Sequence, residues 1–331
     1  MTPNHIPMYS YNELLKLFND YLLNNKFDLE PRGLYHPVNY IMGLGGKRIR
    51  PLVCLMTANI FNDDLSGIYP LSYAVEMFHN FTLLHDDIMD NAEIRRGKPT
   101  VHKKYDNNTA ILSGDLMMIK SFQYILNTKI ETENKIKILD LFTKTAIEVC
   151  EGQQYDMDFE SMRSLDIDIY LKMIKLKTAV LLAYSFKSGA LAGGASEKDA
   201  ELFYDYGINL GLAFQIQDDL LDLYGDEKVF GKIKGGDILQ KKKSYLYLKA
   251  LEQTVDKAKL IDDYNSDFES SDSKVEYFLK IYDDLQIPEK AKDEIENYNQ
   301  KALKNLDSLS VDKTKLKEII ELHDFLMARE Y

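Results

Sequence analysis

The pattern Asp-Asp-x-x-Asp occurs twice in this chain, each time within apolar sequence that favours a helix. The first copy contains Asp86, Asp87 and Asp90, and the second contains Asp218, Asp219 and Asp222. At 3.6 residues per turn, the first and last aspartates of each copy share one helix face. Carboxylates held so close repel each other, and apolar surroundings strengthen the repulsion. The pattern therefore predicts helices that bind cations, and oxygen ligands favour hard ions such as Mg²⁺ shared with substrate phosphates.

The composition is that of a globular protein with a substantial core. Of the 331 residues, 45% are hydrophobic and 28% are charged, and the eight prolines leave long stretches that can form helix. We therefore expect an all-α fold. Because no low-complexity linker divides the chain, we expect one domain over residues 1–331. The net charge of −12 argues against a nucleic-acid partner.

The sequence predicts neither a membrane span nor a signal peptide. No uncharged apolar run reaches the roughly 18 residues that a bilayer span requires. The N-terminal residues lack the basic start and apolar run of a signal peptide, so we expect a cytoplasmic protein. Cys54 and Cys150 both lie in apolar helical sequence, and we expect them to be buried, reduced thiols.

Hydrophobic periodicity, glycine and proline predict the order of the helices. We expect helices at 9–25, in a short segment near 36, from Pro51, from Pro70 through the first aspartate motif, and at 107–128, 132–160, 167–192 and 197–224. Gly207 and Gly211 in the last of these predict close approach to a neighbouring helix. Residues 225–244 are rich in glycine and lysine and are expected to form a loop, whereas residues 245–331 should form outer amphipathic helices.

Basic residues accompany the first aspartate motif. His79 lies about 20° from Asp86 around an ideal helix, so it is either a ligand on that face or an ordinary core histidine. Arg95 and Arg96 follow the helix and either pair with the aspartates or bind the same phosphates as the metal ions. Upstream, the segment GGKRIRP is either a solvated turn or an anion site, and it contains Lys47, Arg48 and Arg50.

Polar groups also surround the second motif. Lys177 and Thr178 interrupt an apolar helix, where a lysine needs a partner or an anionic ligand. Gln215 precedes Asp218 by three residues and shares its helix face. The loop at 225–244 either faces solvent or closes as a lid over a polyanion, and its lysines are Lys228, Lys232, Lys234, Lys241, Lys242 and Lys243. Two acidic motifs with several basic clusters predict a pocket for diphosphates attached to hydrocarbon.

These motifs together resemble those of the trans-type isoprenyl diphosphate synthases, the polyprenyl synthetase family. The matching segments span residues 45–244 and are GGKRIRP, Glu76 with His79, HDDIMDNAEIRRGKPTVH, EGQQYDM, Lys177-Thr178, FQIQDDLLD and FGKIKGGDI. The resemblance implies a single bundle of about a dozen helices around a central apolar cavity. It also implies a homodimer, three Mg²⁺ ions per active site, and isopentenyl and allylic diphosphates as substrates.

The resemblance also implies roles for individual residues. Isopentenyl diphosphate would be bound by Lys47, Arg50, His79 and Arg96. Mg²⁺ would be bound by Asp86, Asp90 and Asp218, with Asp87, Asp219 and Asp222 as further ligands or their neighbours. The allylic diphosphate would be bound, and stabilised as it leaves, by Arg95, Lys177, Thr178, Gln215, Lys232 and Lys242. The family usually has glycine before the last lysine, and here Lys241 takes that place, so Lys241 or Lys243 could serve instead of Lys242.

The implied reaction follows from charge. Metal ions and cationic side chains stabilise the departing diphosphate, which leaves an allylic cation. The isopentenyl double bond attacks that cation, and the proton is then lost to the departed diphosphate. Apolar walls keep water away from the cation.

Residues just before the first aspartate motif set the product length in this family. Phe81 stands five positions before Asp86, and the small Thr82 stands four before it. This arrangement resembles archaeal-type geranylgeranyl diphosphate synthases and implies a C20 product, with the C15 farnesyl product as the alternative. Phe78 could also narrow the cavity.

Two other interpretations remain open. A class I terpene cyclase also uses an aspartate-rich helix and Mg²⁺, but its second metal motif normally has the form Asn-Asp-x-x-Ser-x-x-x-Glu. A non-catalytic subunit of a heteromeric synthase commonly loses aspartate motifs or basic residues, which this chain retains. Turnover by the purified chain alone separates both from the synthase.

Overall fold

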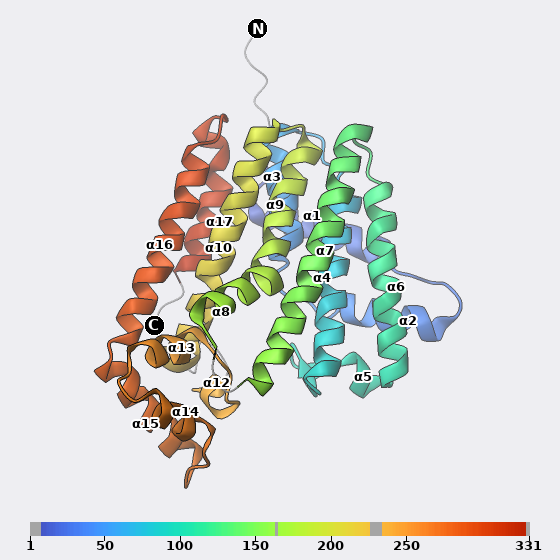
Figure 1. Ribbon diagram of the computed structural model, residues 1–331. Helices are drawn as coiled ribbons and strands as arrows, with labels where there is room; N and C mark the ends of the chain where they lie inside the picture. The colour runs from blue at the N-terminus through green and yellow to red at the C-terminus, as the bar shows by residue number, and fades with distance from the viewer. Residues whose placement is uncertain (1–7, 163–164, 226–233, 329–331) are drawn as a thin grey trace. The chain divides into compact units, whose positions relative to one another are not determined.

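The structure of the chain is a computed structural model, which describes residues 8–162, 165–225 and 234–328. The described residues are mainly helical (Figure 1). The predicted all-α fold is therefore confirmed. The backbone forms two compact units. The first lies within residues 1–143, 184–203 and 310–320, and the second within 144–183, 204–309 and 321–331. No helix in the described part of the chain is long and apolar enough to cross a membrane.

The first unit begins with four helices and a short hairpin. The elements are α1 (Tyr11–Asn24), α2 (Arg32–Met42), α3 (Ile49–Phe61), α4 (Tyr69–Met89), β1 (Ile94–Arg95) and β2 (Lys98–Pro99). They are followed by α5 (Val101–Lys104), α6 (Asn107–Leu126) and the first part of α7 (Thr132–Ser161). The unit also contains the end of α9 (Val180–Gly193), the start of α10 (Glu197–Tyr224) and the 3₁₀-helix η2 (Lys313–Leu316). Helix α4 packs along α6, and this contact supports the helix that carries the first aspartate motif.

Local sequence explains where these helices start. Ser10 and Glu13 form a reciprocal capping box at the start of α1, which buries Leu14, Phe18 and Leu22 at intervals of four residues. Pro70 lies in the first turn of α4, where a missing N–H costs nothing. The apolar spacing and the proline therefore predict both helices correctly.

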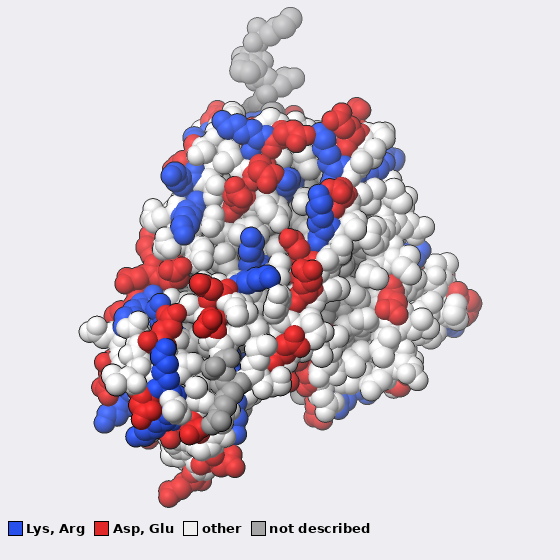
Figure 2. Space-filling view, in the orientation of Figure 1, with Lys and Arg blue, Asp and Glu red and all other residues white. Residues whose placement is uncertain are grey.

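The second unit contains the remaining helices. They are the end of α7, α8 (Ile167–Ile174), the π-helix η1 (Lys175–Ala179), α12 (Gly236–Leu239), α13 (Tyr245–Gln253), α14 (Lys257–Asn265), α15 (Ser271–Asp284), α16 (Ile287–Asp307) and the end of α17 (Lys317–Met327), with most of α10. Helix α13 packs against α14, α15 and α16 (Figure 1). Acidic and basic side chains are interspersed on the outer surface of these helices (Figure 2). Residues 245–328 are thus the packed amphipathic helices that the sequence predicts.

The structure corrects four details of the sequence analysis. The short helix expected near 36 begins earlier, at Arg32, and the next helix begins at Ile49, which puts Pro51 in its first turn. A β-hairpin was not expected, yet β1 and β2 pair because Arg96 and Gly97 both have positive φ, as a tight hairpin turn requires. The expected loop at 225–244 contains the short helix α12. Cys54 is buried as expected, but Cys150 is exposed on α7.

Candidate active site

The first aspartate motif lies at the end of α4. Asp90 is the C-cap residue and keeps helical backbone angles (φ −80°, ψ −3°), so it follows Asp86 along the same helix face as predicted. Asp86 is half-buried and Asp90 is exposed. Asp87 points in another direction and is buried. The first and last carboxylates of the motif are therefore accessible on one face of the helix.

Asp87 forms an ion pair with the hairpin that follows the helix. Arg95 donates from Nε to Asp87 Oδ2 (2.8 Å) and from Nη2 to Asp87 Oδ1 (2.7 Å). This bidentate geometry is the strongest form of guanidinium–carboxylate contact. Of the two arginines after the motif, Arg95 thus pairs with an aspartate, which orients its guanidinium beside α4.

A second group of cations gathers around His79. Arg50, in the first turn of α3, has Nη1 3.4 Å from His79 Nε2. Arg50 Nε is buried and has no hydrogen-bond partner within the described residues. Burial lowers the pKa of His79 well below its usual value, and the neighbouring Arg50 and Arg96 lower the pKa further, so the imidazole is neutral. Clustered cations of this kind favour binding of an anion.

The two glycines of GGKRIRP allow Arg96 to join this cluster. Arg96 donates from Nη1 to the backbone oxygen of Gly45. A Cβ on Gly46, whose φ is +118°, would lie only 2.7 Å from Arg96 Cζ. Gly46 is therefore required both by its backbone conformation and by the close approach of the guanidinium. Lys47, next in the chain, is exposed, and its backbone oxygen accepts a hydrogen bond from the Tyr11 hydroxyl (2.6 Å).

Arg48 has a different role from its neighbours in this segment. It is buried, it forms an ion pair with Glu76, and it donates from Nη2 to the backbone oxygen of Met42 (2.6 Å). Glu76 also accepts a hydrogen bond from Asn80 Nδ2 (2.8 Å). Arg48 and Glu76 therefore support the turn from inside the fold. The sequence could not distinguish this buried arginine from Lys47 and Arg50 on either side.

Aromatic residues pack together beneath the first motif. Phe81 is buried, with its ring centroid 5.4 Å from that of Phe78 and 4.8 Å from that of His85. Phe78 in turn packs against Phe142 of α7, at a centroid distance of 5.0 Å. Thr82 turns its hydroxyl back to the His79 backbone oxygen (2.8 Å). Phe81 and Phe78 thus form an apolar wall one to two turns before Asp86, where the predicted product-length residues should lie.

The second aspartate motif lies near the end of α10. Asp218 and Asp222 are half-buried, whereas Asp219 is buried. Asp219 Oδ2 accepts hydrogen bonds from the Tyr170 hydroxyl (2.5 Å) and from the backbone N–H of Tyr245 (2.7 Å). Burial raises the pKa of Asp219 above its usual value, and repulsion from Asp237 raises it further. As in the first motif, the middle aspartate is bound by protein groups.

Lys177 and Thr178 lie in the π-helix η1. Lys177 donates from Nζ to Asp156 Oδ2 of α7 (2.6 Å), and the Thr178 hydroxyl donates to Gln215 Oε1 of α10 (3.3 Å). A Cβ on Gly152 would lie 2.4 Å from the Lys177 backbone nitrogen, and one on Gly211 would lie 2.7 Å from Ala179 Cα. The predicted close approach at Gly211 is confirmed. Single π turns occur often at functional sites.

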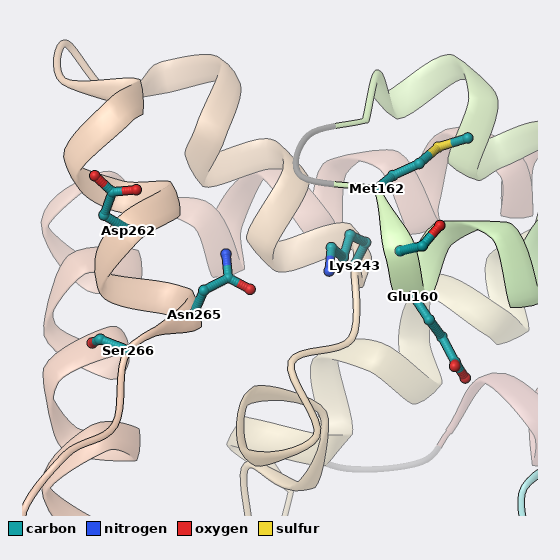
Figure 3. A pocket seen from close by; sticks show the side chains of 7 residues that line it. Glu160, Met162, Lys243, Asp262, Asn265 and Ser266 are labelled. Atoms are coloured by element: carbon teal, nitrogen blue, oxygen red, sulfur yellow. The ribbon is translucent and has the colours of Figure 1, made fainter.

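The three consecutive lysines after α12 have different environments. The Lys242 side chain is 61% exposed, with Nζ 3.8 Å from Asp237 Oδ1. Lys241 donates to the backbone oxygen of Asn265 (2.7 Å). Lys243 is 8% exposed and lines a cavity of about 400 Å³ formed with the ends of α7 and α14 (Figure 3). Lys241 is thus bound to the end of α14, and Lys243 donates to the backbone oxygen of Lys241 (3.3 Å). Lys242 has the most exposed side chain of the three, and this favours it as the ligand of a diphosphate. Lys228 and Lys232 lie outside the described residues.

The carboxylates do not form a closed metal site by themselves. Within the described residues, no three His, Cys, Asp or Glu side chains converge closely enough to hold an ion. The middle aspartates are engaged by Arg95 in one motif and by Tyr170 and Tyr245 in the other. On α4, Asp86 is half-buried and Asp90 is exposed, and on α10, Asp218 is half-buried, so each carboxylate is accessible within its own unit. Carboxylates of this kind suit Mg²⁺, which is usually held by one or two carboxylates together with water and substrate phosphates.

Solved structures place the fold in the class of isoprenyl diphosphate synthases. A crystal structure of a geranylgeranyl pyrophosphate synthase superposes with a TM-score of 0.92 at 44% sequence identity, covering 98% of this chain and 100% of that one. The family model described as "Polyprenyl synthetase" matches residues 31–282. The chain therefore belongs to the polyprenyl synthetase family.

Two curated relatives are similar over most of the chain. The geranylgeranyl diphosphate synthase of Methanosarcina mazei is 36% identical over 301 residues, which cover 91% of each chain. The geranylfarnesyl diphosphate synthase of Natronomonas pharaonis is 34% identical over 323 residues, which cover 91% of this chain and 92% of that protein. Overall similarity therefore extends to relatives named for different product lengths.

Proposed function

We propose that this chain is a Mg²⁺-dependent prenyltransferase that condenses isopentenyl diphosphate with an allylic diphosphate, head to tail, to make geranylgeranyl diphosphate (C20). The observation that carries the proposal is the cluster of Arg50, His79 and Arg96. It combines two cations with a neutral imidazole and a buried Arg50 Nε that lacks a hydrogen-bond partner within the described residues. A cluster of this charge and geometry fits a diphosphate. The relatives named as geranylgeranyl diphosphate synthases support the reaction and the product.

The roles proposed for the residues are those that the family resemblance implies. Lys47, Arg50, His79 and Arg96 bind isopentenyl diphosphate. The allylic diphosphate is bound by Arg95, Lys177, Thr178, Gln215 and Lys242, with Lys232 from outside the described residues. His79 donates or accepts a hydrogen bond as a neutral ring, because its arginine neighbours keep its pKa low. The proton released in the condensation passes to the departed diphosphate, as the family resemblance implies.

Asp86, Asp90 and Asp218 would hold the Mg²⁺ ions, three per active site. When bound, Mg²⁺ supplies positive charge that stabilises the leaving diphosphate. The carboxylates of Asp87 and Asp219 orient Arg95 and the start of α13, respectively, through the hydrogen bonds described above. The activity should therefore depend on metal: a chelator should stop turnover, and added Mg²⁺ should restore it.

Product analysis of the purified chain tests the proposal. The chain is incubated with labelled isopentenyl diphosphate, Mg²⁺ and each allylic starter in turn. A C20 product that is not formed when chelator is present supports the proposal. A C15 or C25 product would agree with the proposed reaction but contradict the proposed product length. Absence of elongation with every starter would favour a partner subunit of a heteromeric synthase or a terpene cyclase.

The Phe81→Ala variant should make a longer product. Removing the ring opens the apolar wall below Asp86, and Phe78 behind it then sets the next limit. The expected result is that the main product gains at least one five-carbon unit, measured by mass spectrometry of the extracted chains. Phe325→Ala, at an exposed position of α17, serves as the control and should leave the product unchanged. An unchanged product from Phe81→Ala would exclude Phe81 as the floor of the cavity.

We also propose that the protein is a homodimer in the cytoplasm. Leu112, Ile119 and Leu126 of α6 are spaced by seven residues, and they are 59%, 63% and 54% exposed. Seven-residue spacing places them in one stripe along the helix. A second copy of the chain is the occupant we expect, since the family resemblance implies a homodimer. Covering the stripe in this way would remove a row of large apolar side chains from water.

The Ile119→Lys variant tests this interface. A lysine at the centre of the stripe should weaken association by about 2 kcal/mol or more, because it leaves a charge in an apolar contact. Light scattering after size-exclusion chromatography should then show monomer at concentrations where the unmodified chain is a dimer. Val255→Lys, at a fully exposed position between α13 and α14, is the control and should remain dimeric. A dimeric Ile119→Lys protein would exclude this stripe as the interface.

A further inference from the structure

The aspartates of the second motif contact the backbone on both sides of Lys242. On the C-terminal side of Lys242, Asp219 Oδ2 accepts a hydrogen bond from the backbone N–H of Tyr245, the first residue of α13 (2.7 Å). On the N-terminal side, Asp222 Oδ2 accepts the backbone N–H of Asp237 in α12 (3.0 Å), and the Asp222 backbone oxygen accepts the N–H of Gly235 (2.8 Å). The segment that carries Lys242 is therefore fastened to α10 at both ends.

The cap supplied by Asp219 is unusual for a helix start. The N-cap residue of α13 is Ser244, a good capping type, but within the described residues its own side chain makes no capping bond. The buried Asp219 carboxylate binds the first amide of the helix from α10 instead. The same oxygen also accepts the Tyr170 hydroxyl of α8 (2.5 Å), which fixes the orientation of the carboxylate. Asp219 thus joins α8, α10 and the start of α13.

Further contacts hold the Lys242 backbone rigidly. The Tyr264 hydroxyl donates to the backbone oxygen of Lys242 (2.6 Å), and the Lys242 N–H donates to the backbone oxygen of Asp237 (2.9 Å). The adjacent Lys241 has a positive φ of 57°, an uncommon conformation for a lysine. The backbone N–H and oxygen of Lys242 are thus both hydrogen-bonded, while its side chain remains largely exposed.

We propose that Asp219 is a positioning residue, which holds the first turn of α13 and thereby places Lys242, rather than a metal ligand. This inference rests on the proposed function, in which Lys242 binds the allylic diphosphate. Asp219 lies next to the metal-binding Asp218 in sequence, yet its carboxylate faces Tyr170 and the amide of Tyr245. The two neighbouring aspartates have separate roles because they are 100° apart around α10.

Amide hydrogen exchange tests the positioning without metal or substrate. In Asp219→Ala, the Tyr245 amide loses its acceptor, so amides in the 236–245 segment should exchange at least ~10-fold faster than in the unmodified chain. Asp218→Ala, a substitution of the adjacent residue, is the matched control. In this variant, the amides of the 236–245 segment should exchange at the same rate as in the unmodified chain. Equal protection in both variants would overturn the proposal. The result does not depend on turnover, so it is independent of whether the proposed reaction is correct.

Kinetics of asparagine variants distinguish positioning from metal binding, even if the alanine variant folds poorly. In the Asp219→Asn variant, the side-chain amide oxygen can accept both hydrogen bonds. The kcat of this variant, and the Mg²⁺ concentration at which it reaches half its maximal rate, should therefore stay within about threefold of the values of the unmodified chain. Asp218→Asn removes a proposed ligand and should raise the Mg²⁺ requirement by about tenfold or more. A raised Mg²⁺ requirement in Asp219→Asn would identify Asp219 as a ligand and refute its positioning role.

A double-mutant cycle tests the connection to Lys242. Asp219→Ala and Lys242→Ala should each raise KM for the allylic diphosphate, by about tenfold for a lost charged contact. If Asp219 acts through Lys242, the double variant should be no worse than Lys242→Ala alone. Additive effects would show that Asp219 contributes by another route and would contradict the proposal.

Discussion

The Gly152→Ala variant is expected to lose about 3 kcal/mol of stability, because overpacking against immobile atoms costs roughly that much. A Cβ at this position would lie 2.4 Å from the Lys177 nitrogen and 2.7 Å from the Leu176 carbonyl carbon. These are backbone atoms of the π-helix η1, so α7 or η1 must shift. The midpoint of urea unfolding should fall accordingly.

The same substitution should also reduce turnover. Lys177 is held by Asp156 on α7, so any separation of α7 from η1 moves the ammonium relative to its partner. Misplacement by about 1 Å can lower the rate by about 100-fold. Both kcat and the unfolding midpoint should therefore fall together. Gly33→Ala in α2, where a Cβ meets nothing within 4 Å, is the control, and it should leave kcat unchanged and should not lower the unfolding midpoint. If the Gly152→Ala protein keeps its stability and its kcat, close contact between α7 and η1 is not required for either property.

The Asp86→Asn variant should lose about three orders of magnitude in kcat, since electrostatic stabilisation of a leaving group commonly contributes on that scale. The carboxylate is accessible and lies on the helix face shared with Asp90. Asparagine keeps the shape of the side chain but removes the charge that attracts Mg²⁺ in the proposed function. Steady-state rates measured over a series of Mg²⁺ concentrations should show the loss even at saturating metal.

The control for this prediction is Asp63→Asn. Asp63 is an exposed carboxylate between α3 and α4, so its replacement changes the net charge by the same amount without touching the motif. Its kcat should equal that of the unmodified chain. Comparable activity of Asp86→Asn and Asp63→Asn would contradict a metal-binding role for Asp86.

Periodicity predicted the elements that carry the aspartates. The extent of α10 agrees with the predicted 197–224 helix, and Asp86 and Asp90 share a face because α4 keeps helical geometry through its C-cap. These features depend on local sequence, in which apolar spacing and glycine or proline boundaries are strong signals. The all-α fold followed from the same signals.

Tertiary contacts were harder to predict. Arg48 and Arg50 are two residues apart, yet one is buried against Glu76 and the other lies beside His79. The partners of Asp219 could not be inferred from spacing, because Tyr170 and Tyr245 are distant in sequence. The pairing of Asp87 with the nearby Arg95 was one of the two alternatives that the sequence left open. The hairpin had only a weak signal, since Gly97 adopts positive φ readily but Arg96 adopts a conformation that is uncommon for arginine. The π-helix has no periodic signature, because one turn is too short to alter the pattern.

The π-helix places an additional constraint on the length of the chain. A π turn contains one residue more than the α-helical turn it replaces. Deleting any single residue within 175–179 could restore a regular α-helix, which would be the more stable local structure. Because the deletion removes the extra residue of the π turn, α8 and α9 would keep their orientation, and the residues of the turn itself would take new positions around the helix, about 100° apart. Lys177 and Thr178 would then no longer have the positions from which they contact Asp156 and Gln215. This segment should therefore tolerate many substitutions on its outer side but no change in its number of residues.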